Sequence, residues 1–288
     1  MATLFKSEQG KNEVFALYEE KLRQLDLTYE SRFVDTTRGK THLLITGPAD
    51  QPPLLLVHGS NACAPIALEA YPELCKKYRV YAVDVLGQPN KSAEVRLSMK
   101  DDSYGQWMDE VMEALGLEQV TLLGFSFGGL VILKTLINHG SRVKAVFLAA
   151  PAYLVNGNPL KALWKVFIPM RRYMRTQKIA YIEKFLSVLF TKRDNFAIRF
   201  LSKVFLHFDM DFTPVPVISK QEAQKIDTPI TLIAAEQDIM FPGKKMIKRA
   251  QQILPSLRQA VLLTDSKHVQ DAAGNQRVEK LVLEDKNN

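Results

Sequence analysis

The sequence contains little cysteine and no long apolar run. Cys63 and Cys75 are the two cysteines among 288 residues, and their spacing does not match a C-x-x-C redox or metal motif. This scarcity argues against a disulfide framework and favours a reducing, cytoplasmic setting. No stretch approaches the roughly 20 apolar residues of a membrane-spanning helix. The polar start of the chain is also unlike a secretory signal.

Acidic residues are scarce in one segment of the chain. The sequence carries 38 Lys and Arg against 31 Asp and Glu, which gives a net charge of +7. Residues 153–215 hold eleven basic and four acidic residues, so this segment accounts for the whole excess. Because no nucleic-acid-binding motif accompanies this local charge, we expect no nucleic-acid partner. Solvated outward faces explain the basic residues more simply than contact with an anionic membrane surface does.

Short apolar runs alternate with amphipathic segments along most of the chain. This alternation is typical of an α/β fold in which helices cover both faces of a mostly parallel central sheet. We predict strands at 54–57, 80–83, 120–123, 143–149, 230–234 and 260–263, and helices at 66–77, 104–115, 128–138 and 244–254. A peripheral helix at 10–25, within an N-terminal segment 1–28, and a hairpin with strands at 32–35 and 41–46 are predicted ahead of them.

Residues 153–215 interrupt this alternation. The segment holds nearly half of the aromatic residues and several helical patterns, and it is closed by Pro214 and Pro216. We interpret it as a helical cap, or lid, inserted into a core that is formed by residues 1–152 and 216–288.

A G-x-S-x-G motif lies where a predicted buried strand meets a predicted helix. It reads Gly124-Phe125-Ser126-Phe127-Gly128. A sharp turn in this context lifts the serine hydroxyl above the carboxyl edge of the sheet, and the flanking glycines provide the room that the turn needs. The helix that follows aims its N-terminus at the reacting group. We therefore predict that Ser126 is a nucleophile.

A serine hydroxyl needs a base to take its proton, and the base needs a carboxylate to orient it. In this strand–turn–helix context the chain order is serine, acid, histidine. Asp238 follows the predicted strand 230–234, and His268 follows the predicted strand 260–263. We predict Asp238 as the acid and His268 as the base. Glu236 and Asp265 are the competing acids.

Acyl transfer also needs two N–H donors for the negative oxygen that develops on the substrate. The backbone N–H of Phe127, directly after the nucleophile, is the first predicted donor. The loop after strand 54–57 reads His58-Gly59-Ser60-Asn61, and the N–H of Ser60 is the second. We expect His58 to support this loop rather than to transfer protons.

Taken together, these features resemble the α/β-hydrolase fold family over essentially the whole chain. The matching residues are His58-Gly59, Val83-Asp84-Val85-Leu86-Gly87 through Ser92, the serine motif, Arg142-Val143, Asp238 and His268. The opening stretch is similar to a bacterial carboxylesterase branch with an N-terminal helix ahead of the sheet. The resemblance implies a lid after the sixth strand and an enzyme that needs no cofactor; we also expect no metal site. The sequence departs from the family pattern at Lys267, where a glycine is usual, and in the polar tail after His268.

We therefore expect a serine carboxylesterase that cleaves a small or medium acyl ester through an acyl-enzyme on Ser126. Since His268 must be neutral to act as a base, kcat/KM should fall as the pH drops and the imidazole takes up a proton. Two alternatives use the same residues: a hydrolase of C–C bonds or lactones, and a slow-turnover relative that senses a ligand. If Lys267 pointed into the site, its charge would disfavour the protonated form of His268.

Overall fold

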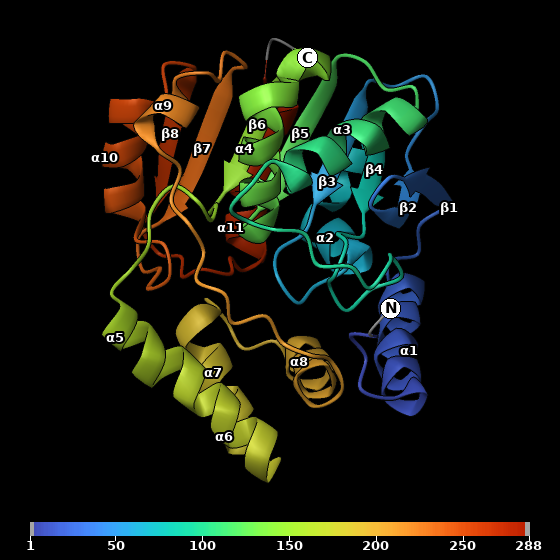
Figure 1. The fold of residues 1–288 in the computed structure, drawn as a ribbon, viewed down its shortest axis with the longest axis vertical. Coiled ribbons are helices and arrows are strands. Elements are labelled where there is room, and N and C mark those ends of the chain that lie inside the picture. The colour runs from blue at the N-terminus through green and yellow to red at the C-terminus, as the bar shows by residue number, and fades with distance from the viewer. Residues whose placement is uncertain (1–2, 286–288) are drawn as a thin grey trace.

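The computed structural model describes residues 3–285, which form one eight-stranded sheet with helices on both faces (Figure 1). The strand order is β1-β2-β4-β3-β5-β6-β7-β8. The strands are β1 (Tyr29–Thr36), β2 (Gly39–Thr46), β3 (Pro53–Val57), β4 (Arg79–Val83), β5 (Val120–Phe125), β6 (Val143–Ala149), β7 (Ile230–Ala235) and β8 (Leu257–Leu263). Strand β2 is antiparallel to both β1 and β4, and every other neighbouring pair is parallel. The predicted α/β class and mostly parallel sheet are confirmed.

Most of the helices outside residues 153–215 divide between the two faces of the sheet (Figure 1). The helices are α1 (Glu8–Gln24), α2 (Ala64–Ala70), α3 (Ser103–Ala114), α4 (Phe127–His139), α5 (Pro159–Ala162), α6 (Ile168–Thr176), α7 (Ile179–Leu189), α8 (Asn195–His207), α9 (Lys220–Ala223), α10 (Gly243–Ile253) and α11 (Ala272–Leu283). Apolar residues of α3, α4 and α10 pack in one core, and those of α1, α2 and α11 pack in the other. Alternate residues of β3 supply the two cores: Leu55 and Val57 point to the first, and Leu54 and Leu56 point to the second. A strand buried on both faces explains why the sequence shows a continuous apolar run.

Two predicted elements differ in detail from the structure. The predicted helix 66–77 is split into α2 and a short 3₁₀ helix, Pro72–Lys76. Pro72 has no backbone N–H to donate and therefore cannot continue the hydrogen bonding of α2. The predicted hairpin is present but longer, since β1 and β2 pair from Tyr29 opposite Thr46 to Thr36 opposite Gly39.

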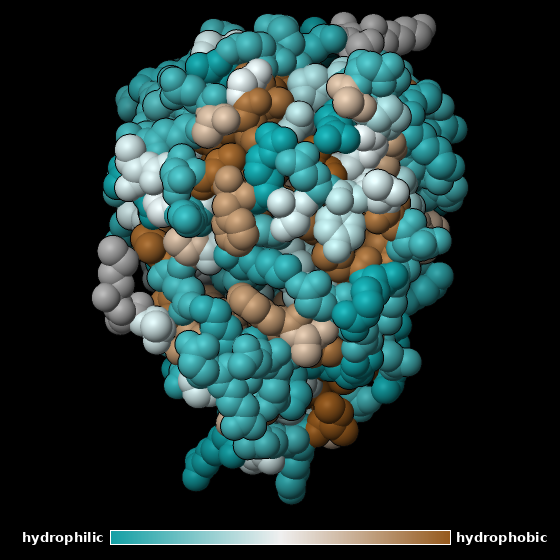
Figure 2. Space-filling view, turned by 90° about the vertical axis from the view of Figure 1, so that its right-hand side faces the viewer, coloured by the Kyte–Doolittle hydropathy of each residue, from teal (hydrophilic) through white to brown (hydrophobic). Residues whose placement is uncertain are grey.

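Helices α5 to α8 belong to the insertion, defined here as residues 153–215, and they follow β6 and precede β7 in the chain. Figure 1 shows them together at one end of the molecule, apart from the helices that flank the sheet. A short π-helical stretch, Leu163–Phe167, joins α5 to α6. Helix α8 is held against α1 by ion pairs from Arg199 to Glu20 and from Lys203 to Glu13. Among residues 3–285, no helix is long and apolar enough to cross a membrane. The face of the molecule that Figure 2 shows is mostly hydrophilic, with smaller hydrophobic areas between the hydrophilic residues.

Candidate active site

Ser126 occupies a tight turn between β5 and α4. Its backbone has φ 51° and ψ −112°, a strained conformation that few residues other than glycine adopt. The turn is fixed because the Ser126 N–H donates to the carbonyl of Ala149 (3.0 Å) and the Ser126 carbonyl accepts from the Ala152 N–H (2.9 Å). A Cβ atom on Gly124 would lie 2.6 Å from Ile132, and one on Gly128 would lie 2.2 Å from the carbonyl oxygen of Val57. The two glycines of the motif are therefore required by close packing.

The structure brings the three predicted catalytic side chains together. The Ser126 hydroxyl lies 3.0 Å from His268 Nε2, and His268 Nδ1 lies 2.7 Å from Asp238 Oδ2. All three residues are buried, with 7%, 8% and 3% of their surface exposed. The His268 ring also contacts the rings of Phe125 and Phe241, with centroid distances of 5.2 and 5.4 Å. This geometry allows a proton to pass from the serine hydroxyl to the imidazole while Asp238 orients the ring.

Asp238 is held as a carboxylate. Its Oδ1 atom accepts hydrogen bonds from the backbone N–H groups of Met240 (2.7 Å) and Phe241 (3.0 Å). Burial alone would raise the pKa of this carboxyl, but the charge and hydrogen bond of His268 and the two N–H donors outweigh burial. The pKa of Asp238 consequently lies below its ordinary value. An ionised acid in this position would stabilise a positively charged imidazolium at His268.

The competing acids have other partners. Glu236 forms an ion pair with Lys244, and Asp265 lies 3.3 Å from Arg277 in an exposed pair. Neither carboxylate contacts His268.

A second serine, histidine and aspartate lie within hydrogen-bond distance of one another elsewhere in the sheet. Ser31 lies 2.8 Å from His42 Nε2, and His42 Nδ1 lies 2.8 Å from Asp84. Tyr18 of α1 also donates to Asp84 (3.0 Å). Ser31 belongs to the outer strand β1 instead of a strand-to-helix turn. We interpret Tyr18, His42 and Asp84 as a buried polar network that joins α1 to the sheet, with the exposed Ser31 at its outer end.

The insertion contacts the loop that carries His268. The sequence showed no sign of this contact. The Val269 N–H donates to the carbonyl of Leu189 (2.9 Å), and the Thr191 N–H donates to the carbonyl of Val269 (2.9 Å). The Thr191 hydroxyl accepts from the Lys267 N–H (3.0 Å) and donates to the Val269 carbonyl (2.8 Å). The chain after α7 therefore holds the residues on both sides of His268. No local pattern marks this contact, because 76 residues separate Thr191 from Lys267.

Lys267 points toward the insertion at the protein surface. Its ammonium group donates to the carbonyl of Ser187 in α7 (2.7 Å) at the protein surface. The inward orientation that would have disfavoured a protonated His268 is therefore not adopted. The unusual lysine instead provides one more contact between the histidine loop and the insertion.

The two predicted oxyanion donors lie at one small cavity. Ser60 and Phe127 both line a cavity of about 70 Å³, together with residues of the insertion that include Phe208 and Thr213. Within residues 3–285, neither backbone N–H donates to another protein group. Gly59 lets the two segments approach, since a Cβ atom there would lie 2.9 Å from the Phe125 ring. Two N–H groups without a protein acceptor at one cavity are the arrangement that an oxyanion hole would need.

His58 supports this loop and is not in contact with Ser126. Its Nδ1 donates to the carbonyl of Gly59 (2.7 Å), and its Nε2 accepts from the Val85 N–H (3.0 Å). Burial lowers the pKa of His58 below its ordinary value, against the opposing charge of Asp84 and the hydrogen bond to Gly59. A neutral imidazole with these two fixed partners connects the loop after β3 to the loop after β4.

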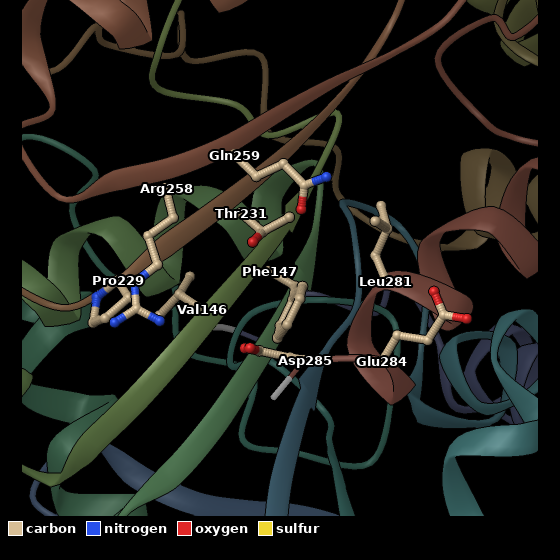
Figure 3. A pocket seen from close by; sticks show the side chains of 9 residues that line it. All are labelled: Val146, Phe147, Pro229, Thr231, Arg258, Gln259, Leu281, Glu284 and Asp285. Carbon is tan, nitrogen blue, oxygen red and sulfur yellow. The ribbon is translucent and has the colours of Figure 1, made fainter. Parts of the chain in front are cut away.

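A larger cavity, of about 500 Å³, lies at the opposite edge of the sheet. Figure 3 shows its lining from the middle of β6, the amino-terminal ends of β7 and β8, and the end of α11. Its nine lining residues include no serine and no histidine. Among residues 3–285, no group of three or more His, Cys, Asp or Glu could hold a metal ion. The chemistry-bearing side chains therefore gather at the carboxyl edge, around Ser126.

Comparisons with known proteins agree with this architecture. A family profile described as alpha/beta hydrolase fold matches residues 52–177. The carboxylesterase nap of Bacillus subtilis (strain 168) is 26% identical over 271 residues, which cover 88% of this chain and 86% of that protein. Carboxylesterase YbfK of the same organism is 32% identical over 138 residues, which cover 48% of this chain and 47% of that protein. The crystal structure of naproxen esterase from Bacillus subtilis superposes with a TM-score of 0.83 at 23% identity, covering 96% of this chain and 98% of that one. The chain therefore has the α/β-hydrolase fold, and it is similar in sequence to two carboxylesterases of Bacillus subtilis.

Proposed function

We propose that the protein is a serine carboxylesterase in which Ser126, His268 and Asp238 are the catalytic residues. The observation that carries the proposal is the continuous hydrogen-bonded chain from Asp238 through His268 to Ser126. Both curated relatives described above are named carboxylesterases, which favours ester hydrolysis over the C–C-bond, lactone and ligand-sensing alternatives.

The reaction would proceed in two acyl-transfer steps. His268 Nε2 takes the proton of Ser126 as the serine oxygen attacks the ester carbonyl, and the N–H groups of Ser60 and Phe127 stabilise the negative oxygen. His268 then returns the proton to the departing alcohol, which leaves an acyl group on Ser126. A water molecule that gives its proton to His268 attacks this acyl-enzyme, and the acid is released as Ser126 is regenerated.

We further propose that residues 153–215 are a cap over this site, on a core of residues 1–152 and 216–288. Two contacts support a cap. The segment after α7 pairs with the histidine loop through the bridge between Phe190 and Val269. The segment after α8 contributes Phe208, Asp211, Thr213 and Val215 to the cavity at the predicted oxyanion donors. The proposed substrate is an ester of a small or medium acyl group.

A panel of p-nitrophenyl esters from acetate to decanoate tests this proposal. We expect sustained turnover that is strongest for the shorter chains. Ser126→Ala should lower kcat by at least about 10³-fold, because loss of the nucleophile removes the acyl-enzyme route. A single burst of one product per protein without further turnover would instead support the ligand-sensing alternative. Hydrolysis that persists in Ser126→Ala would refute the proposed nucleophile.

A further inference from the structure

The first half of the insertion carries one sign of charge only. Residues 159–182 contain six basic residues and no aspartate or glutamate. The six are Lys161, Lys165, Arg171, Arg172, Arg175 and Lys178, and all are exposed. They lie along α5, the π-helical stretch, α6 and the turn into α7. These six cations define what we call the basic face.

None of the cations of the basic face forms an ion pair within the part of the chain that the structure describes. Arg171 and Arg172 lie over aromatic rings, at 5.5 Å from Phe212 and 5.8 Å from Tyr181, and these contacts leave their charge uncompensated. Four of the five later cations of the insertion differ, and Lys184 is the exception. Lys192, Arg193, Arg199 and Lys203 all pair with carboxylates. The unpaired charge is therefore concentrated on the basic face.

Large apolar side chains are exposed among these cations. Leu160 and Trp164 each expose 66% of their surface, and Leu163 exposes 45%. Their helical neighbours Ala162 and Val166 are buried and point inward. Because residues i, i+3 and i+4 share one side of a helix, the three exposed residues form an outward apolar stripe. These three side chains do not pack in the core, so core packing does not explain why the three positions hold leucine and tryptophan.

A surface of this kind fits the interface of an anionic membrane. Helices that lie on a bilayer combine a tryptophan and leucine stripe with flanking lysine and arginine. The apolar side chains enter the region between headgroups and acyl chains, while the cations remain near the lipid phosphates. An acidic protein partner would satisfy the charge but would not account for Leu160 and Trp164 at the most exposed positions.

We propose that the basic face, with Leu160, Leu163 and Trp164, docks this protein on the surface of an anionic phospholipid bilayer. The sequence favoured solvated outward faces for these cations, and the structure changes that interpretation because it exposes the apolar stripe beside them. Docking is independent of the acyl-transfer reaction, so Ser126→Ala should bind vesicles as the unaltered chain does.

The two tryptophans make the test specific, because Trp107 is completely buried and Trp164 is exposed. The protein is titrated with vesicles of phosphatidylcholine and phosphatidylglycerol in a 3:1 ratio, and with vesicles of phosphatidylcholine alone. We expect a blue shift of the Trp164 emission and co-sedimentation with the mixed vesicles at low salt. Both signals should weaken as the ionic strength rises, because salt screens surface charges. Trp164→Phe should keep sedimentation but lose the shift.

Two double variants distinguish docking through the basic face from a general attraction between the positively charged protein and anionic vesicles. Lys165→Glu with Arg172→Glu should weaken vesicle binding at least tenfold. Lys77→Glu with Lys225→Glu makes the same charge change at exposed positions elsewhere and should leave binding unchanged. Equal loss in both pairs, or no binding to anionic vesicles at low salt, would overturn the proposal. Binding to soluble polyglutamate but not to vesicles would also overturn it, in favour of an acidic protein partner.

Discussion

The contact between the insertion and the histidine loop predicts that Thr191 positions His268. Replacing Thr191 with valine keeps nearly the same shape and removes only the hydroxyl. That hydroxyl accepts from the Lys267 N–H at 3.0 Å and donates to the Val269 carbonyl at 2.8 Å. The backbone hydrogen bonds of Thr191 and Leu189 with Val269 would remain. Thr191→Val should therefore loosen the histidine loop without unfolding the insertion.

The size of the effect follows from the two lost hydrogen bonds. A net contribution of about 0.5–1.5 kcal/mol per bond gives about 1–3 kcal/mol, and the partial exposure of Thr191 favours the lower half of that range. If this energy holds His268 in place for proton transfer, kcat should fall about 5- to 30-fold, since 1.4 kcal/mol corresponds to a factor of ten. KM for a small ester should change little, because Thr191 does not line the cavity at the predicted oxyanion donors.

Steady-state kinetics on p-nitrophenyl acetate, with thermal unfolding as a check on folding, would measure this effect. Thr176→Val is the matched control. The hydroxyl of Thr176 also donates to a backbone carbonyl, that of Arg172 at 2.8 Å, and accepts from a backbone N–H, that of Lys178 at 3.4 Å. It lies on α6, away from the histidine loop. A folded Thr191→Val protein with kcat within twofold of the unaltered chain would refute the positioning argument, as would an equal loss in the control.

Three further predictions follow from the site. Asp238→Asn should lower kcat by about 10³- to 10⁴-fold with a smaller change in KM, as steady-state kinetics would show, because the amide cannot stabilise the imidazolium; a loss below tenfold would contradict this role. Folding lowers the pKa of Asp238. The ionised carboxylate therefore stabilises the folded state at a pH above the pKa of the unfolded chain, about 3.9. This stabilisation is lost as the pH falls through the lower pKa of the folded state. The difference in unfolding free energy between the unaltered chain and Asp238→Asn, measured by urea titration, should therefore narrow below about pH 4; a constant difference would contradict it. Gly128→Ala should destabilise the fold by more than about 2 kcal/mol in the same titration, because its Cβ would lie 2.2 Å from the Val57 carbonyl, and an unchanged midpoint would contradict the packing argument.

Local patterns in the sequence predict much of the fold. A parallel strand that is buried on both faces leaves a continuous apolar run, and β3, β5 and β7 were found this way. The positions of Ser126, Asp238 and His268 were predictable because each follows a strand, and the carboxyl ends of parallel strands meet at one edge. The boundary at Pro72 was missed because the amphipathic pattern continues across it.

Contacts between distant segments were not predictable. The direction of Lys267 depends on where α7 ends, and nothing near the lysine in sequence encodes that position. Exposure in the insertion was equally hidden, because an amphipathic helix shows which residues share a side but not whether another element covers that side. Trp164 and Phe205 are both aromatic residues of the insertion, yet the first is exposed and the second is buried.

Labelling with a fluorophosphonate, followed by mass-spectrometric mapping of the adduct, tests the central claim most directly. The reagent reacts with serines that an adjacent base activates. Our account predicts one adduct per chain, on Ser126, which is lost in both Ser126→Ala and His268→Ala. An adduct on Ser31, which also contacts a buried histidine, or an absence of labelling in the folded protein would contradict the assignment of Ser126 as the nucleophile.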